Sequence, residues 1–193
     1  CELPSNHWFS DACSEEIAQE WLSIVRANYN HPSLVTWVIF NESWGVRNIS
    51  KNSQQRDLAN GLYYLTKSID CMRPVISNDG WEHAKSDILT LHDYEQDGSK
   101  LYKRYETMCK ITEASSENDQ PMPFADGCVY RGQPIVISEF GGTAYVRDEA
   151  TGWGYGTGVK NDEEFLDRFA SLVCAVDKMG LSGSRYTQLT DVH

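Results

Sequence analysis

The chain has 193 residues, of which 40% are hydrophobic and 23% are charged, so it can form one sizeable core but is short for two domains. Its net charge of −11 argues against nucleic acid and anionic membranes as partners, because a negative field repels phosphates. No apolar stretch approaches the length of a transmembrane helix, so we expect no membrane partner.

Six cysteines are spread along the chain, and none forms a C-x-x-C pair. This spacing argues against a zinc site, and we expect neither a metal nor a cofactor. Several cysteines have apolar, helix-like neighbours, which is typical of reduced thiols, so a cytoplasmic location is favoured over secretion. The six occupy positions 1, 13, 71, 109, 128 and 174.

Two helices and a buried strand are predicted in the first third of the chain. Apolar residues recur at helical spacing over 14–28, with Asp11 or Ser14 as the N-cap. Residues 34–40 are almost entirely apolar and rich in Val, Ile, Trp and Phe, which predicts a strand covered on both faces. A second amphipathic helix is predicted over 54–69.

The rest of the chain continues to mix short strands and helices. We predict strands at 73–77, 87–91, 133–138 and about 184–190, helices at 99–114 and 162–179, and loops at 116–133 and 143–156. No hairpin signal such as Asn-Gly joins two apolar runs. Alternating strands and helices predict βαβ units around a parallel sheet, which is an α/β fold.

Polar groups stand where four predicted strands end: Asn41-Glu42, Asn78-Asp79, His92-Asp93 and Glu139. In a parallel sheet or barrel these ends meet at one edge, where ligands bind. Glu42 and Glu139 follow the two most apolar strands, which would hold both carboxylates rigidly. Such a pair suits glycosidic bond cleavage: one carboxyl protonates the leaving oxygen, and the other attacks the anomeric carbon or activates water.

Other strand-end side chains suit a sugar ligand. Asn41 is expected to hydrogen-bond a sugar hydroxyl. The rings of Trp44, Trp81, Tyr94 and Trp153 are expected to stack on apolar sugar faces.

Each of these residues also has a structural alternative. A strand-end Glu is commonly a solvated loop residue, Asn41 and Asp79 suit turns, and the rings could simply cover a barrel rim. His92 could pair structurally with Asp93 or bind a metal, but no second His stands at ligand spacing.

Two segments carry a family resemblance. HPSLVTWVIFNESWG at 31–45 resembles the acid/base segment of glycoside hydrolase family 2, the group of β-galactosidases, β-glucuronidases and β-mannosidases. PIVISEFGG at 134–142 resembles the nucleophile segment of the same family. An Asn-Glu pair followed much later by a second strand-end Glu is specific in combination.

The resemblance implies a (β/α)8 TIM-type barrel and a retaining mechanism. By position, Glu42 matches the acid/base, Glu139 the nucleophile and Asn41 the residue that contacts the sugar 2-hydroxyl. Tyr94 matches a tyrosine that steadies the nucleophile. In a retaining pair the carboxyls lie about 5–5.5 Å apart. The further residues expected to bind substrate are Trp44, Asp79, Trp81, His92 and Trp153.

The similarity spans essentially the whole chain, from Cys1-Glu2-Leu3-Pro4, which resembles the end of the third barrel strand, to residues 186–191, which resemble the eighth. Residues 1–193 are therefore expected to form part of one catalytic barrel, without the first barrel strands or the preceding β-sandwich domains of the family. An open barrel exposes strand edges. We expect missing segments, or a second copy in a homo-oligomer, to close it.

Three functional hypotheses follow. The leading one is a retaining β-glycosidase, β-galactosidase-like, that hydrolyses terminal β-linked sugars. The alternative is a non-catalytic carbohydrate-binding or inactive barrel fragment. An unrelated α/β hydrolase or isomerase is disfavoured, because neither G-x-S-x-G nor a phosphate-binding Gly-Lys-Ser/Thr loop is present.

Overall fold

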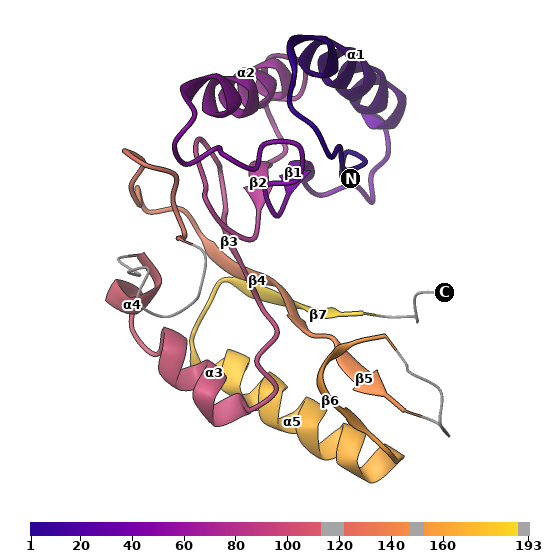
Figure 1. The fold of residues 1–193 in the computed structure, drawn as a ribbon, viewed down its shortest axis with the longest axis vertical. Helices are drawn as coiled ribbons and strands as arrows, with labels where there is room; N and C mark the ends of the chain where they lie inside the picture. Colours follow the sequence, from indigo (N-terminus) through magenta and orange to yellow (C-terminus); the bar gives the residue numbers. More distant parts are fainter. Residues whose placement is uncertain (113–121, 147–152, 189–193) are drawn as a thin grey trace. The chain divides into compact units, whose positions relative to one another are not determined.

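The computed structural model describes residues 1–112, 122–146 and 153–188 (Figure 1). These residues fall into two compact units: residues 1–90 with 122–134, and residues 91–112 with 135–146 and 153–188. None of the described helices is long and apolar enough to cross a membrane.

The first unit contains two helices and a pair of parallel strands. The helices are α1 (Asp11–Asn28) and α2 (Ser53–Ile69), and the strands are β1 (Trp37–Asn41) and β2 (Val75–Asp79). β1 and β2 pair in parallel with Asn41 opposite Asp79. On its other edge β1 forms a parallel bridge between Val38 and Glu2, which confirms the strand end predicted at the first residues. The two helices lie on one side of the strand pair (Figure 1).

Polar side chains cap both helices of this unit. Ser10 begins α1, because its Oγ accepts a hydrogen bond of 3.2 Å from the Cys13 N–H. The prediction of Asp11 or Ser14 as the cap is therefore wrong, and Asp11 lies instead in the first turn, where its charge suits the helix dipole. Asn52 begins α2 in the same way, by accepting hydrogen bonds from the first turn.

Two indole rings anchor the apolar core of the first unit. Trp21 of α1 and Trp37 of β1 are completely buried and pack edge to face, with ring centroids 5.8 Å apart. Trp21 Nε1 donates to Thr66 Oγ1 at 2.7 Å, and Trp37 Nε1 donates to Asp70 Oδ2 at 2.9 Å. Both indole N–H groups are thus satisfied inside the core, which removes the penalty of burying them.

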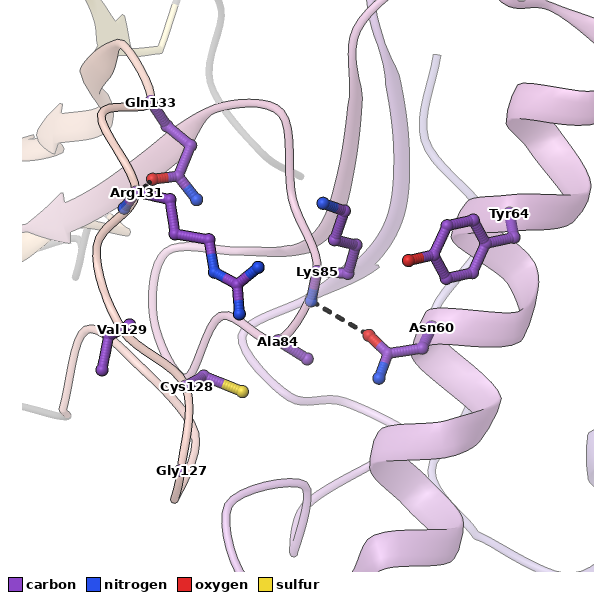
Figure 2. Close-up of a pocket in the computed structure, with 9 residues that line it drawn as sticks. All are labelled: Asn60, Tyr64, Ala84, Lys85, Gly127, Cys128, Val129, Arg131 and Gln133. Atoms are coloured by element: carbon purple, nitrogen blue, oxygen red, sulfur yellow. Dashed lines mark hydrogen bonds between the residues drawn. The ribbon is translucent and has the colours of Figure 1, made fainter.

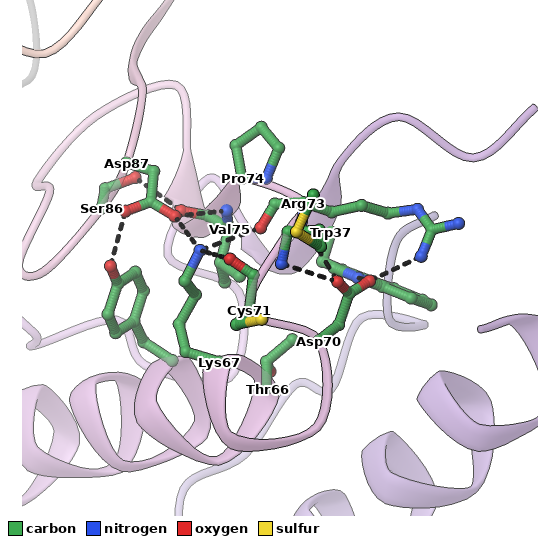
Figure 3. Close-up of polar contacts among 12 residues, drawn as sticks. Trp37, Thr66, Lys67, Asp70, Cys71, Arg73, Pro74, Val75, Ser86 and Asp87 are labelled. Carbon is green, nitrogen blue, oxygen red and sulfur yellow. Dashed lines mark hydrogen bonds and ion pairs between the residues drawn. The ribbon is translucent and has the colours of Figure 1, made fainter. Parts of the chain in front are cut away.

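Two carboxylates fasten the end of α2 to the start of β2 (Figure 3). Asp70 pairs with Arg73 Nη1 at 2.6 Å, while Asp87 accepts from Lys67 Nζ at 3.1 Å and from the Val75 N–H at 2.9 Å. Burial opposes ionisation of both groups, but the hydrogen bonds outweigh it. They lower the pKa of Asp70 to about 2 and hold the pKa of Asp87 below its usual value.

The second unit is built on a sheet with strand order β3–β4–β7. β3 (Leu89–Asp93) enters this unit at residue 91, and β4 (Ile135–Gly141) pairs in parallel with β7 (Gly183–Thr187). Helices α3 (Gly98–Tyr105) and α5 (Asp162–Lys178) pack together on one side of the sheet, and the short α4 (Met108–Thr112) follows α3 (Figure 1). A separate parallel pair consists of β5 (Thr143–Tyr145) and β6 (Tyr155–Val159).

Several strands end two or three residues later than the sequence indicates. The strands predicted at 73–77, 87–91 and 133–138 are observed as β2, β3 and β4. Asn78, Asp79 and His92 are consequently buried strand residues rather than surface tips. At Asn78 the side-chain amide finds partners inside the unit, in the Ser43 N–H and hydroxyl and the Trp81 carbonyl oxygen, so this polar residue can be buried in a strand.

The predicted continuous sheet is only partly confirmed. Parallel pairing and the α/β character are present, but the described strands form three small sheets, none of them closed. Residues 80–88 join β2 to β3 without the helix that strict alternation requires. This connection instead makes a bridge between His83 and Phe124.

Two further predictions need correction. The described part of the helix predicted over 99–114 is two helices, because α3 ends at its C-cap, Glu106, and residues 113–114 lie outside the described residues. In the described parts of the loop predicted at 143–156, residues 143–145 form β5 and residues 155–156 begin β6, whereas residues 147–152 lie outside the described residues. Gly154 permits close packing there, because a Cβ on it would lie 2.4 Å from the Ala144 nitrogen. Helix α5 confirms the helix predicted over 162–179, and its apolar residues Phe169 and Val173 are partly exposed.

The loop predicted at 116–133 is confirmed for residues 122–133, apart from the single bridge at Phe124. Residues 116–121 of that loop and residues 189–190 of the last predicted strand lie outside the described residues. Strand β7 accounts for the described part of the strand predicted at about 184–190.

Candidate functional site

In the first unit, the predicted site residues gather where β1 and β2 end. The parallel register brings Asn41 opposite Asp79, and the Glu42 N–H donates to the Asp79 carbonyl oxygen at 3.0 Å. Glu42 therefore follows directly on the last paired residue of a buried strand. The carboxyl ends of parallel strands are where α/β proteins bind their ligands.

The backbone at Glu42 is strained. Glu42 and the next residue, Ser43, have φ values of 51° and 57°, and nearby Glu82 has 47°. A left-handed conformation costs a residue with a side chain roughly 1–3 kcal/mol, and it persists only where the surroundings enforce it. Such strain is concentrated at functional sites and switch regions.

Hydrogen bonds to Ser43 enforce this conformation. The buried Asn78 accepts from the Ser43 N–H through Oδ1 at 2.9 Å and donates from Nδ2 to Ser43 Oγ at 3.0 Å. The Ser43 hydroxyl in turn donates to Glu82 Oε2 at 2.6 Å. Asn78 Nδ2 also donates to the Trp81 carbonyl oxygen at 2.7 Å, so one amide joins both strand-end turns.

Asn41 presents an acceptor with no partner among the described residues. Its Oδ1 atom is buried and makes no hydrogen bond there. A buried carbonyl oxygen is costly to leave unsatisfied, so an orphan at a strand end indicates a ligand or an ordered water.

The aromatic residues of this edge are held to different degrees. The Trp44 ring packs edge to face against His7, with centroids 5.1 Å apart, and carries the Arg47 guanidinium 3.9 Å from its centroid. Its position is thus fixed on two sides. Trp81 is half-buried, and Asp79 is buried as the last residue of β2.

In the second unit, Glu139 lies at an irregularity of β4. The pairing of β4 with β7 shifts register between Ile137 and Phe140, which flank Glu139. Such a bulge re-aims the side chains next to it and is common beside active sites. The Glu139 side chain is 17% exposed, so it remains accessible at the strand end.

Three side chains converge on the Glu139 carboxylate. The Tyr94 hydroxyl donates to Oε2, Arg185 Nη2 donates to Oε1 at 3.3 Å, and His92 Nδ1 lies 3.9 Å from Oε2. Arg185 Nε also donates to the Ser138 carbonyl oxygen at 2.9 Å, which fixes the guanidinium against β4. His92 and Glu139 are the residues described in this unit that could ligate a cation.

Glycines and a second ring position Tyr94. Its ring stacks on Tyr155 at a centroid distance of 3.6 Å and an interplanar angle of 11°. A Cβ on Gly142 would lie 2.7 Å from Tyr155 and 3.0 Å from Tyr94, so the second glycine of the EFGG segment makes room for both rings. Gln96 Nε2 donates to the carbonyl oxygens of Tyr94 at 2.9 Å and Gly141 at 2.6 Å, tying β3 to β4.

The surroundings keep Tyr94 protonated. Burial raises the pKa of its phenol, and the hydrogen bond to Glu139 and the negative charge of that carboxylate raise it further. The phenol is therefore a stable donor to Glu139 through the neutral range. Trp153 lies at the edge of this group, half exposed, with its ring 5.7 Å from that of Tyr155.

The predicted residues thus divide between the two units. Asn41, Glu42, Trp44, Asp79 and Trp81 belong to the first unit, and His92, Tyr94, Glu139 and Trp153 to the second.

Nothing in the sequence indicated three supporting residues, Gln96, Tyr155 and Arg185. The sequence indicated Asn78 as a strand-end polar group, but not its hydrogen bonds to Ser43. The paired glycines after Glu139 were the one signal that a bulky partner approaches there.

Comparisons with known proteins relate this chain to one family. Residues 4–152 match the model for the family described as glycosyl hydrolases family 2, TIM barrel domain. No curated protein matches the sequence at a significant level.

Solved structures with a similar fold include three bacterial β-glucuronidases. That of Faecalibacterium prausnitzii is 19% identical with a TM-score of 0.60 and is matched over 93% of this chain and 29% of its own. β-Glucuronidase 3 of Bacteroides uniformis is 14% identical with a TM-score of 0.62, and the match covers 96% of this chain and 24% of that protein. The β-glucuronidase of an uncultured Clostridium sp. is 15% identical with a TM-score of 0.59, and the match covers 90% of this chain and 28% of that protein.

The chain spans less than a third of the length of these structures, so it corresponds to a fragment of TIM-barrel type. At such low identity the likeness concerns the fold alone. The match to the family model covers most of the sequence, and the chain therefore belongs to glycoside hydrolase family 2.

Proposed function

We propose that the chain carries the two catalytic carboxylates of a retaining β-glycosidase, with Glu139 as the nucleophile and Glu42 as the acid/base. The observation that carries the proposal is the convergence of Tyr94 and Arg185 on Glu139. Donors on both carboxylate oxygens orient the group for attack, as a nucleophile in a double displacement requires. The strained backbone that carries Glu42 supports a functional role for the second carboxyl.

The proposed reaction has two steps. A Glu139 oxygen attacks the anomeric carbon and the bond to the leaving oxygen breaks, while the Glu42 carboxyl gives its proton to that oxygen. A covalent glycosyl-enzyme ester results. Ionised Glu42 then takes a proton from water, the water oxygen attacks the anomeric carbon, and Glu139 leaves as a carboxylate with net retention of configuration.

The proposed sugar contacts use the remaining strand-end residues. The orphaned Asn41 Oδ1 suits acceptance of a hydrogen bond from the sugar 2-hydroxyl. The rings of Trp44, Trp81 and Trp153 are proposed to stack on apolar sugar faces, with Asp79 and His92 as polar contacts. β-Galactosides are the first substrates to test, followed by β-glucuronides, because the structurally similar proteins are β-glucuronidases.

In the complete catalytic domain, residues 1–193 are proposed to supply the barrel from the end of its third strand to its eighth. A segment outside these residues, or a second copy of the chain, is proposed to supply the remaining strands. This extent fits the small share of the β-glucuronidase structures that the chain matches.

The test compares Glu42→Gln and Glu139→Gln on dinitrophenyl and alkyl β-glycosides. Glu42→Gln should lower the rate of glycosyl transfer to the enzyme about 10²–10⁴-fold for alkyl substrates, whose leaving groups need a proton. For dinitrophenyl substrates, whose leaving group needs none, the rate of this first step should fall much less. Added azide should restore turnover in Glu42→Gln as a β-glycosyl azide, because an anion needs no general base. Glu139→Gln should lose at least about 10⁴-fold on both substrates.

Glu163→Gln, in the exposed first turn of α5, is the matched control and should retain full activity. Equal losses for both site variants on both substrates, with no azide product, would contradict the assignment. Sugar binding by calorimetry without release of any aglycone would instead support the alternative, a non-catalytic carbohydrate-binding barrel.

A further inference from the structure

A pocket of about 210 Å³ lies in the first unit (Figure 2). Its walls are helix α2 at Asn60 and Tyr64, the connection after β2 at Lys85, and the loop of residues 127–133. None of the predicted site residues lines it. The pocket is therefore independent of the proposed glycosidase site.

Two cations face this pocket without a carboxylate. Arg131 and Lys85 both line it (Figure 2), and Lys85 Nζ also lies 5.8 Å from the centre of the Tyr63 ring. Neither side chain forms an ion pair within the described part of the chain, and no lining residue there is acidic. In a protein of net charge −11, two cations left together in a concave site create a local positive potential.

Two neutral side chains of the pocket, Asn60 and Tyr64, can donate hydrogen bonds. Asn60 Oδ1 accepts from the Lys85 N–H at 3.0 Å, which leaves the Asn60 Nδ2 group as a donor. The Tyr64 hydroxyl points toward the pocket beside Lys85 (Figure 2). The Arg131 main chain is fixed by a hydrogen bond of 2.8 Å from its N–H to Gln133 Oε1.

We propose that this pocket binds an oxyanion of the phosphate or sulfate class, as the inorganic ion or as an ester on a sugar. An Arg guanidinium offers paired N–H groups that match two oxygens of such an ion, and a Lys ammonium adds a point charge. Tyr64 and Asn60 supply neutral donors for the remaining oxygens. The volume leaves room for a group attached to the anion.

The test is a calorimetric titration of the full chain with sodium phosphate and sodium sulfate, at ionic strength held constant with sodium chloride. We expect one oxyanion bound per chain. Lys85→Gln and Arg131→Gln should each weaken binding by at least about tenfold, because each removes a charged hydrogen-bond donor. The double variant Lys51→Gln/Lys178→Gln, which removes two exposed cations elsewhere, should keep the wild-type affinity.

A titration with glucose 6-phosphate, with glucose as the control without an anion, distinguishes a phosphate ester from inorganic phosphate as the ligand. Tighter binding of the ester than of inorganic phosphate identifies a phosphorylated sugar as the ligand, and equal binding identifies the ion itself. Absence of binding by any oxyanion, or equal loss in the control double variant, would overturn the proposal. Glu139→Gln should leave oxyanion binding unchanged, because Glu139 does not line this pocket. A failure of the glycosidase assignment would therefore show in the turnover assays and not in this titration.

Discussion

The two units hold their strand-end glutamates by different means. In the first unit the hydrogen bonds described around Glu42 fix its main chain and that of Ser43, with Asn78 as the central support. In the second unit the contacts to Glu139 reach its carboxylate directly, from Tyr94 and Arg185.

This difference has energetic consequences. The left-handed turn at Glu42 is held by hydrogen bonds from buried residues of the unit. Substitutions that remove these bonds should therefore lower both the free energy of unfolding and the activity. The hydrogen-bond donors around Glu139 orient its carboxylate. Substitutions of these donors should therefore lower activity with little effect on the free energy of unfolding. Five predictions test this contrast, from the largest expected effect to the smallest.

Asp70→Ala should destabilise the first unit most. It leaves Arg73 and the buried Trp37 N–H without their partner, and breaking a buried ion pair typically costs about 3–5 kcal/mol. Urea unfolding at neutral pH measures the loss, with the exposed Asp57→Ala on the same helix as control. A change below that of the control would contradict the role given to this carboxylate.

The pH dependence of unfolding tests the same group. Because the folded pKa of Asp70 is about 2, below its usual value of 3.8, its contribution is present above about pH 4 and is lost as the pH falls toward 2. The shift corresponds to about 2 kcal/mol. Asp70→Asn should remove that part of the acid destabilisation between pH 4 and 2.

Tyr94→Phe should reduce kcat/KM roughly 10- to 100-fold, from the roughly 1.5–3 kcal/mol that a hydrogen bond to a charged group contributes. The fold should be barely affected, because the ring still stacks on Tyr155. Tyr102→Phe makes the same chemical change on α3, away from Glu139, and should be silent. A large loss of stability without loss of activity would reverse the contrast between the units.

Asn78→Ala should lower the unfolding free energy by about 1–3 kcal/mol, because the Ser43 N–H is left buried and unsatisfied. Activity should fall with it, since Glu42 loses its support. The neighbouring Ser77→Ala is a strict control: Ser77 Oγ is buried without a partner in the described residues, so its removal should be neutral or stabilising. Unchanged stability in Asn78→Ala would disprove the main-chain anchor.

Arg185→Gln should have the smallest effect. Its side chain is 63% exposed, and ion pairs of that kind contribute about 0–1 kcal/mol, which limits the loss in kcat/KM to about fivefold. The effect should shrink further in about 1 M salt, where charges are screened within 3 Å. A hundredfold loss would instead give Arg185 a direct part in the chemistry.

Local sequence pattern predicted the elements better than their ends. The apolar run at 34–40 and the helical spacing at 54–69 sufficed to predict β1 and α2. In each segment the pattern of apolar residues alone indicates which side chains are buried. The end of β2 was placed too early, since Asn78 reads as a surface residue until its partners Ser43 and Trp81 are known. Those partners are close in space and distant in sequence.

The same reason limits prediction of the candidate site. Glu42 and Glu139 are visible as charges that end buried strands, whereas Arg185 lies on a strand far along the chain and carries no motif of its own. Gln96 and Tyr155 act only through packing around Tyr94. Gly154 was interpreted as a loop residue, whereas it permits the close approach of β5 and β6.

The central claim, that Glu139 is the nucleophile, is tested most directly by covalent trapping. A dinitrophenyl 2-deoxy-2-fluoro-β-glycoside forms the glycosyl-enzyme readily but releases it slowly, because the fluorine destabilises the charged transition state of both steps. After tryptic cleavage at the arginines of the sequence, mass spectrometry should find the sugar on peptide 132–147, attached to Glu139. Label on peptide 27–47, which contains Glu42, or no label on either peptide, would contradict the account.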